Sequence, residues 1–135
     1  MKNIKQYYKE LGKLVYAVAA ADGSIQTEER DKLHQFVLKE LAENERTNDS
    51  SGMNQAFYVD FEFDMAAEKH LGVNEVIKSY ARFLHTNYEP SDWALMANSV
   101  KLLEVVALAY SKQKEKEIIS MIKGEINEIG KPAKI

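Results

Sequence analysis

The chain contains no cysteine among its 135 residues. This absence excludes disulfide bonds, a thiolate nucleophile and metal sites with cysteine ligands. Glycine and proline are also scarce, with 6 and 2 residues, and no glycine-rich loop is present to hold a phosphate group. The chain lacks a Gly-x-Ser-x-Gly sequence, which would place a nucleophilic serine on a strained turn. We therefore predict no catalytic residue and a protein that is not an enzyme.

Positive charge is not in excess, because the formal net charge at pH 7 is -3. A nucleic-acid surface needs a basic face to meet the phosphates, so we expect no nucleic-acid partner. No stretch approaches the roughly 18 to 20 apolar residues that span a bilayer, and residues 1–6 contain no secretory signal. We expect a cytoplasmic protein with no direct membrane insertion.

The composition that remains is that of one globular domain. The chain has a mass of 15.4 kDa, with 45% apolar and 29% charged residues, which suits a single hydrophobic core. Apolar residues recur at spacings of three and four along most of its length, the pattern of helices that bury one face. We predict an all-α fold, a compact single-domain bundle of about six or seven helices. This domain is expected over residues 1–130, with a frayed C-terminal tail over residues 131–135.

The helical pattern is clear in most of the chain. It predicts helices over residues 4–21, 27–41, 74–86, 91–110 and 118–129. Residues 43–52 are polar and predict a loop. Ser91 is expected to cap the helix that follows it, and Trp93 in the first turn of that helix is expected to close the core.

Residues 55–65 give conflicting signals. Alternation of apolar and polar side chains is typical of a strand, and Phe57, Val59, Phe61 and Phe63 alternate here with Tyr58, Asp60 and Glu62. Phe57, Phe61 and Met65 also recur at the spacing of four that a helix favours. Because a lone strand would lack a partner, we expect a short extended piece that runs into a helix over residues 64–71. The acidic residues Asp60, Glu62 and Asp64 are expected to form its solvated side.

An internal repeat is visible when the chain is shifted by 88 residues, the separation of Leu14 and Leu102. Self-similarity of this kind is typical of a duplicated unit, although apolar helices also match each other by chance. The interpretation is a bundle built on two related helix pairs. The turns within the two pairs differ, because Asp22 in the first corresponds to Tyr110 in the second.

The most distinctive stretch is residues 19–29, where three carboxylates gather at a helix-turn-helix corner. Asp22 and Gly23 end the first helix, because glycine can take the positive φ that closes it. Thr27 can cap the second helix, and Glu28 and Glu29 occupy its first turn, where the helix dipole favours negative charge. The corner is therefore explained without any ligand.

This corner resembles the hallmark of the TerB-like family, named for tellurite-resistance proteins and also found in the membrane-proximal region of a DnaJ-type co-chaperone. The matching residues are Ala19, Ala21, Asp22, Gly23, Ile25, Glu28 and Glu29. The resemblance implies an all-helical cytoplasmic domain of similar length, without enzymatic activity and built on two related helix pairs. It also implies an association with stress-response or envelope-linked assemblies. In some members, acidic residues near such corners are proposed to bind divalent cations.

Carried over residue by residue, the resemblance gives Asp22, Glu28 and Glu29 as candidate metal ligands. The stretch also matches the second half of an EF-hand loop, with Asp22 at the fifth position and Glu29 at the twelfth. The first half is missing, because Val18 and Ala20 offer no side-chain oxygen and calcium needs six to eight oxygen ligands. No cofactor is therefore predicted with certainty, and a weakly bound calcium or magnesium ion is the one candidate.

Three functions stay open. We favour a non-enzymatic binding or scaffolding module whose acidic corner holds a divalent cation or a basic group of a protein partner. In the alternative, the corner is only a turn, and an apolar surface around residues 57–63 drives self-association with no metal site. The third, an enzyme, would need a pocket that gathers carboxylates from distant helices. Zinc is not expected, because His34, His70 and His85 lack ligand spacing.

Overall fold

The computed structural model describes residues 3–20, 27–45, 48, 51–108 and 113–129. Its α-helices are α1 (Ile4–Ala19), α2 (Thr27–Phe36), α3 (Ala42–Asn44), α4 (Tyr58–Lys69), α5 (Val73–Asn87), α6 (Trp93–Leu108) and α7 (Gln113–Ile129). They are joined in part by a π-helical turn, η1 (Val37–Leu41), and by the 3₁₀ turns η2 (Gln55–Phe57) and η3 (Pro90–Asp92). The described residues form no strand, only an isolated bridge between Asn48 and Asn54. The predicted all-α bundle is confirmed.

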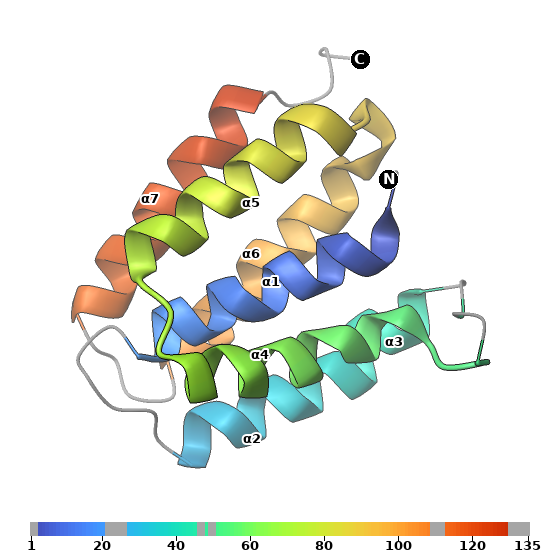
Figure 1. The fold of residues 1–135 in the computed structure, drawn as a ribbon, viewed down its shortest axis with the longest axis horizontal. Helices are drawn as coiled ribbons and strands as arrows, with labels where there is room; N and C mark the ends of the chain where they lie inside the picture. The colour runs from blue at the N-terminus through green and yellow to red at the C-terminus, as the bar shows by residue number, and fades with distance from the viewer. Residues whose placement is uncertain (1–2, 21–26, 46–47, 49–50, 109–112, 130–135) are drawn as a thin grey trace.

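Helix α1 lies at the centre of the bundle, packed against α4, α5 and α6 (Figure 1). Its sequence explains this position, because every residue from Leu11 to its end except Lys13 is apolar or glycine. A helix that is apolar around most of its circumference is buried on several sides. Helix α2 packs against α6 and lies beside α4, and α7 packs against α5 and α6 (Figure 1). The hydrophobic core therefore surrounds α1.

Gly12 allows α1 and α4 to approach each other closely. A Cβ atom added at Gly12 would lie 2.5 Å from the carbonyl oxygen of Val59 and 2.9 Å from the Cβ atom of Glu62. Any larger residue at this position would push α4 away from α1. Gly12 therefore sets the separation of these two helices.

The extended piece expected near residues 57–63 is wrong. Helix α4 already begins at Tyr58, directly after η2, and the helix expected over residues 64–71 is its second half. As a helix, this segment can bury a side chain from each of its turns against α1. A lone strand would leave its backbone N–H and C=O groups without hydrogen-bond partners.

The apolar residues of α4 divide between two faces. Val59, Phe63 and Ala66 are buried, at the i, i+4 and i+7 spacing of one helix face. Phe61 and Met65 are 51% and 44% exposed. The stripe of Phe61 and Met65, which the spacing of four selects in the sequence, is therefore the outer face of the helix and not its core face.

The start of α6 differs slightly from the prediction. Ser91 lies within η3, and α6 begins at Trp93. Glu89 and Asp92 form a reciprocal capping box around η3, in which the backbone N–H of Glu89 donates to Oδ2 of Asp92 at 2.9 Å. This box satisfies amide groups that a single serine cap would leave open. Trp93 is partly buried and packs against the core, in line with the sequence prediction.

The loop after α3 is held by Asn54. Its side-chain amide donates to the backbone carbonyls of Ala42 at 2.8 Å and Glu45 at 3.2 Å. Its side-chain oxygen accepts the backbone N–H of Ala56 at 2.9 Å. One side chain therefore satisfies the end of α3 and the start of η2, and it fixes the backbone at Glu45.

Several sequence predictions lie outside the residues that the structure describes. These are the corner at Asp22 and Gly23, the second corner at residues 109–112 and the tail over residues 131–135. The duplication of helix pairs therefore stays a prediction. None of the described helices is both long enough and apolar enough to cross a membrane.

Candidate functional site

Of the three predicted metal ligands, only Glu28 has a side chain that the structure describes. It is exposed in the first turn of α2, whereas Asp22 and the side chain of Glu29 lie outside the described part of the chain. Among the side chains that are described, no group of three or more His, Asp or Glu residues could hold a metal ion. The metal site at the predicted corner is not tested by these observations and stays a prediction.

A hollow lies between α2 and α4, starting one turn beyond the predicted corner. Its volume is about 410 Å³, and it is lined by Arg30, Asp31, Leu33, His34, Asp60, Phe61, Phe63 and Asp64. We call it the α2–α4 groove. Its apolar floor comes from residues that also belong to the core, since Leu33 and Phe63 are almost fully buried.

One ion pair and one histidine–carboxylate contact cross the α2–α4 groove. The guanidinium group of Arg30 lies 3.0 Å from Oδ1 of Asp64, and Nδ1 of His34 lies 3.1 Å from Oδ2 of Asp60. Each helix contributes its two residues at a spacing of four, which places them one above the other on the same helix face. The two helices therefore meet through matched basic and acidic positions.

Burial has a larger effect on the pKa of Asp60 than its basic neighbours have. Burial raises the pKa of Asp60 above its ordinary value of 3.8, and the charge of Asp64 raises it further. The contacts with His34 and Arg30 lower this pKa, but they do not outweigh burial. An additional cation beside Asp60 would therefore stabilise its ionised form.

The groove adjoins an exposed apolar face of α4. Phe61 lines the groove and is half exposed, and Met65 follows it one turn later. The ring of Phe61 also lies edge-on to the ring of Tyr58, with 6.1 Å between their centroids. Exposed apolar side chains beside a groove with charged residues are typical of surfaces that contact another protein.

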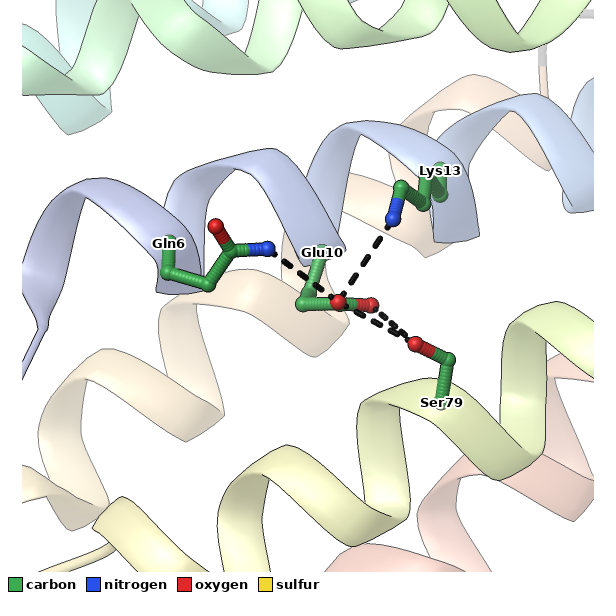
Figure 2. Close-up of polar contacts among 4 residues, drawn as sticks. All are labelled: Gln6, Glu10, Lys13 and Ser79. Carbon is green, nitrogen blue, oxygen red and sulfur yellow. Dashed lines mark hydrogen bonds and ion pairs between the residues drawn. The ribbon is translucent and has the colours of Figure 1, made fainter.

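A second polar group lies between α1 and α5 and is centred on Glu10, which is only 5% exposed (Figure 2). The hydroxyl group of Ser79 donates to its carboxylate, with oxygen distances of 2.9 and 3.1 Å. The side-chain amide of Gln6 donates at 3.3 Å, and the ammonium group of Lys13 lies 3.5 Å away. These contacts satisfy a buried carboxylate and tie α1 to α5.

Ser79 is poorly placed to act as a nucleophile, although its hydroxyl group contacts a carboxylate. It lies in the interior of α5, where each backbone N–H donates to the carbonyl four residues earlier. No neighbouring amide is then left to stabilise an oxyanion, which acyl transfer requires. The geometry around Glu10 and Ser79 therefore supports a structural role.

A third polar group lies in the centre of the core. The hydroxyl group of Tyr7 is 2.6 Å from that of Ser99 and 2.8 Å from that of Tyr80. Ser99 in turn donates to the backbone carbonyl of Leu95 at 2.8 Å. Burial raises the pKa of Tyr7 to about 12, so its phenol stays neutral. This chain of hydroxyl groups links α1, α5 and α6 inside the protein.

Sequence reasoning did not find the α2–α4 groove. It interpreted Asp60 and Asp64 as a solvated face and gave Arg30 and His34 no functional role. The available signal is the matched spacing, since two basic residues four apart in one helix can pair with two acidic residues four apart in another. Choosing the correct pair of helices requires the packing of the whole bundle.

Comparisons of the chain with protein-family models, curated proteins and solved structures find no match. The TerB-like resemblance therefore stays a prediction, and the all-α fold class rests on the described helices alone.

Proposed function

We propose that this protein is a non-enzymatic helical binding module whose α2–α4 groove holds a lysine or arginine side chain of a protein partner. The observation that carries the proposal is the unbalanced negative charge of the groove. Among its described lining residues, Asp31, Asp60 and Asp64 face a single guanidinium group, that of Arg30. His34 adds positive charge only when protonated. With His34 neutral, three carboxylates and one guanidinium group give a formal charge of −2.

The contacts within the groove leave room for a cation from outside. Both side chains of the Arg30–Asp64 pair are more than half exposed, and exposed pairs contribute only about 0 to 1 kcal/mol. A partner's cation can therefore share or replace the contact with Asp64 at little cost. Asp60 gains directly, because a further positive charge offsets the burial that raises its pKa.

The apolar surroundings indicate what else the partner contributes. Phe61 on the rim and Leu33 on the floor can contact the methylene groups of a lysine or arginine side chain. Phe61 and Met65 also offer exposed apolar area for a neighbouring apolar residue of the partner. The partner segment is therefore a basic residue next to apolar ones.

The predicted acidic corner adjoins this groove along the chain. Glu28 is exposed in the first turn of α2, two residues before Arg30. The divalent-cation alternative at Asp22, Glu28 and Glu29, the cytoplasmic location and the stress-response association stay predictions.

The binding test uses two small probes. Nα-acetyl-arginine amide supplies a guanidinium group, and Nα-acetyl-citrulline amide has nearly the same shape without the charge. We expect the arginine probe to bind with a Kd on the order of 1 mM, an affinity typical of a single weak contact. The citrulline probe should bind at least threefold more weakly.

Variants locate the binding. Asp60→Asn and Asp64→Asn should each weaken binding of the arginine probe at least threefold, because each removes one negative charge from the groove. Glu68→Gln is the matched control, since it makes the same charge change at an exposed position of α4 outside the groove. Equal binding of both probes, or the same loss in all three variants, would contradict the proposal.

A second candidate function is self-association through the outer face of α4. The observation that favours it is the exposure of Phe61 and Met65. Val59 and Phe63 are buried, so they cannot belong to the apolar surface that the sequence predicts around residues 57–63. Sedimentation velocity over a concentration series tests this candidate. Self-association that Phe61→Ser abolishes and Asp22→Ala leaves unchanged would favour it over the binding module.

A further inference from the structure

The outer face of α4 lies between two groups of opposite charge. Helix α4 itself lies between α1 and α2 (Figure 1). At about 100° per residue, five positions outside the core follow one another around this helix in the order Asp60, Asp64, Phe61, Met65 and Tyr58. The two aspartates contact α2, and Tyr58 contacts α1. The exposed apolar side chains of Phe61 and Met65 therefore occupy the middle of the face.

Lys5 and Lys9 supply positive charge on the α1 side of this face. Their ammonium groups lie 4.8 and 5.6 Å from the centre of the Tyr58 ring. Neither lysine forms an ion pair with a carboxylate that the structure describes. Glu62 also lies on this side, because its Cβ atom adjoins Gly12 of α1. Two ammonium groups and one carboxylate give the α1 side a formal charge of +1.

The α2 side of the face carries the opposite charge, because it is the edge of the α2–α4 groove. With His34 neutral, the described lining of that groove has a formal charge of −2. Across the face, a basic side is therefore followed by an apolar strip and then by an acidic side. A surface with this order of charges is complementary to a second copy of itself, as the interface of a twofold dimer must be.

The order of charges also selects how two copies pair. A twofold axis that runs along α4 places the basic side of one copy opposite the acidic side of the other, and the two α4 helices then run in the same direction. A twofold axis across α4 would place like charges opposite each other, which is unfavourable. The parallel pair also keeps the charges level, because Tyr58, beside the two lysines, precedes Asp60 by two residues, about 3 Å along the helix axis.

We propose that the partner of the α2–α4 groove is a second copy of this chain, paired through the outer faces of two parallel α4 helices. Lys5 or Lys9 of each copy enters the groove of the other copy and contacts its aspartates. The side chains of Phe61 and Met65 pack between these two charged contacts. This inference rests on the proposed function, because it names the basic group that the groove holds. The two lysines lie beside an exposed apolar strip, which is the combination expected of the partner.

Sedimentation velocity over a concentration series tests for this dimer. We expect a dissociation constant on the order of 0.1 mM, so the average mass should rise from monomer toward dimer between about 10 μM and 1 mM protein. Lys5→Glu combined with Lys9→Glu should raise the dissociation constant at least tenfold. The matched control is Lys78→Glu combined with Lys101→Glu, at exposed positions of α5 and α6, which should leave it unchanged.

A charge exchange locates the contact. Asp60→Lys combined with Asp64→Lys should also weaken self-association at least tenfold. Mixed with the protein that carries Lys5→Glu and Lys9→Glu, it should form a heterodimer, because both contacts again join opposite charges. Circular dichroism checks that each variant is folded. Folded variants that form no heterodimer, or self-association that the glutamate substitutions leave unchanged, would overturn the inference. The second result would indicate a purely apolar contact or an antiparallel pair, in which one like-charge contact only replaces another.

The arginine probe separates this inference from the proposed function. If Nα-acetyl-arginine amide binds in the groove but the protein stays monomeric at about 1 mM, the groove holds a basic group of a different protein. The inference is then wrong, and the proposed function stands. If the probe does not bind and the protein stays monomeric, both are wrong.

Discussion

Replacing Gly12 with alanine should destabilise the protein, although alanine favours a helix more than glycine does. The helical preference alone would stabilise α1 by about 0.5 to 1 kcal/mol. The added Cβ atom would lie 2.5 Å from the carbonyl oxygen of Val59, which forces α1 and α4 apart. Overpacking of this kind costs about 1 to 3 kcal/mol. We expect a net loss of about 1 to 2 kcal/mol in the free energy of unfolding.

Gly124→Ala is the matched control. Gly124 lies in the interior of α7, and a Cβ atom added there would meet no described part of the protein within 4 Å beyond its chain neighbours and the backbone of its own helix. The same substitution should therefore show the helical preference alone and stabilise the protein by about 0.5 to 1 kcal/mol. The opposite signs of the two effects separate helix packing from helix propensity.

Urea unfolding followed by circular dichroism measures both variants. The free energy of unfolding falls by about 1 to 3 kcal/mol per molar urea. The urea concentration at the unfolding midpoint should therefore fall by about 0.5 to 1 M for Gly12→Ala and rise by a few tenths of 1 M for Gly124→Ala. If Gly12→Ala proves at least as stable as the wild type, α1 and α4 do not approach as closely as described. The placement of Asp60 and Asp64 on α4 would then lose its basis.

Three further outcomes follow from the buried polar groups. Glu10→Ala should lower the free energy of unfolding by about 1 to 3 kcal/mol, because it leaves the hydroxyl group of Ser79 without its acceptor. Glu10→Gln should lower the free energy of unfolding less, and urea unfolding compares the two variants. The pKa of Asp60 should exceed 3.8 because of burial and should rise further in His34→Gln, which removes a contact that lowers it; carboxyl NMR titration measures both values. Since the folded Asp60 binds its proton more tightly than the unfolded one, its contribution to stability should fall as pH rises from 3.8 through the raised value. Burial raises the pKa of Tyr7 to about 12, so its contribution to the free energy of unfolding should be fully present below pH 10 and should fall as pH rises from 10 toward 12. Ultraviolet absorbance measures phenolate formation, and circular dichroism measures helix content over the same pH range. Phenolate formation by all tyrosines while the protein is still fully helical would contradict this prediction.

The fold class was predictable because local periodicity carries it. The spacing of Tyr7, Leu11, Leu14 and Val18 predicts one helix, and the structure has α1 there. The residues at the start of α4 could not be assigned in this way. Whether Phe61 or Phe63 enters the core depends on the surface that Gly12 opens on α1, about fifty residues earlier in the chain. Tertiary packing of this kind overrides a strand-like local pattern.

The α2–α4 groove shows the same limit. The spacing of four between Arg30 and His34, and between Asp60 and Asp64, is visible in the sequence. Their pairing depends on α2 and α4 lying side by side, which no local pattern specifies (Figure 1). The corner at Asp22 stands out in the sequence because it concentrates acidic residues, and its metal site stays a prediction.

The most direct test of the central claim maps where a guanidinium group binds. Nα-acetyl-arginine amide is titrated into ¹⁵N-labelled protein, and backbone amide shifts are followed at each residue. We predict that the largest shifts occur at Arg30, His34, Asp60 and Asp64, and that the citrulline probe causes much smaller ones. Shifts confined to residues outside the α2–α4 groove, or equal shifts with the uncharged probe, would contradict the claim that this groove binds a basic group.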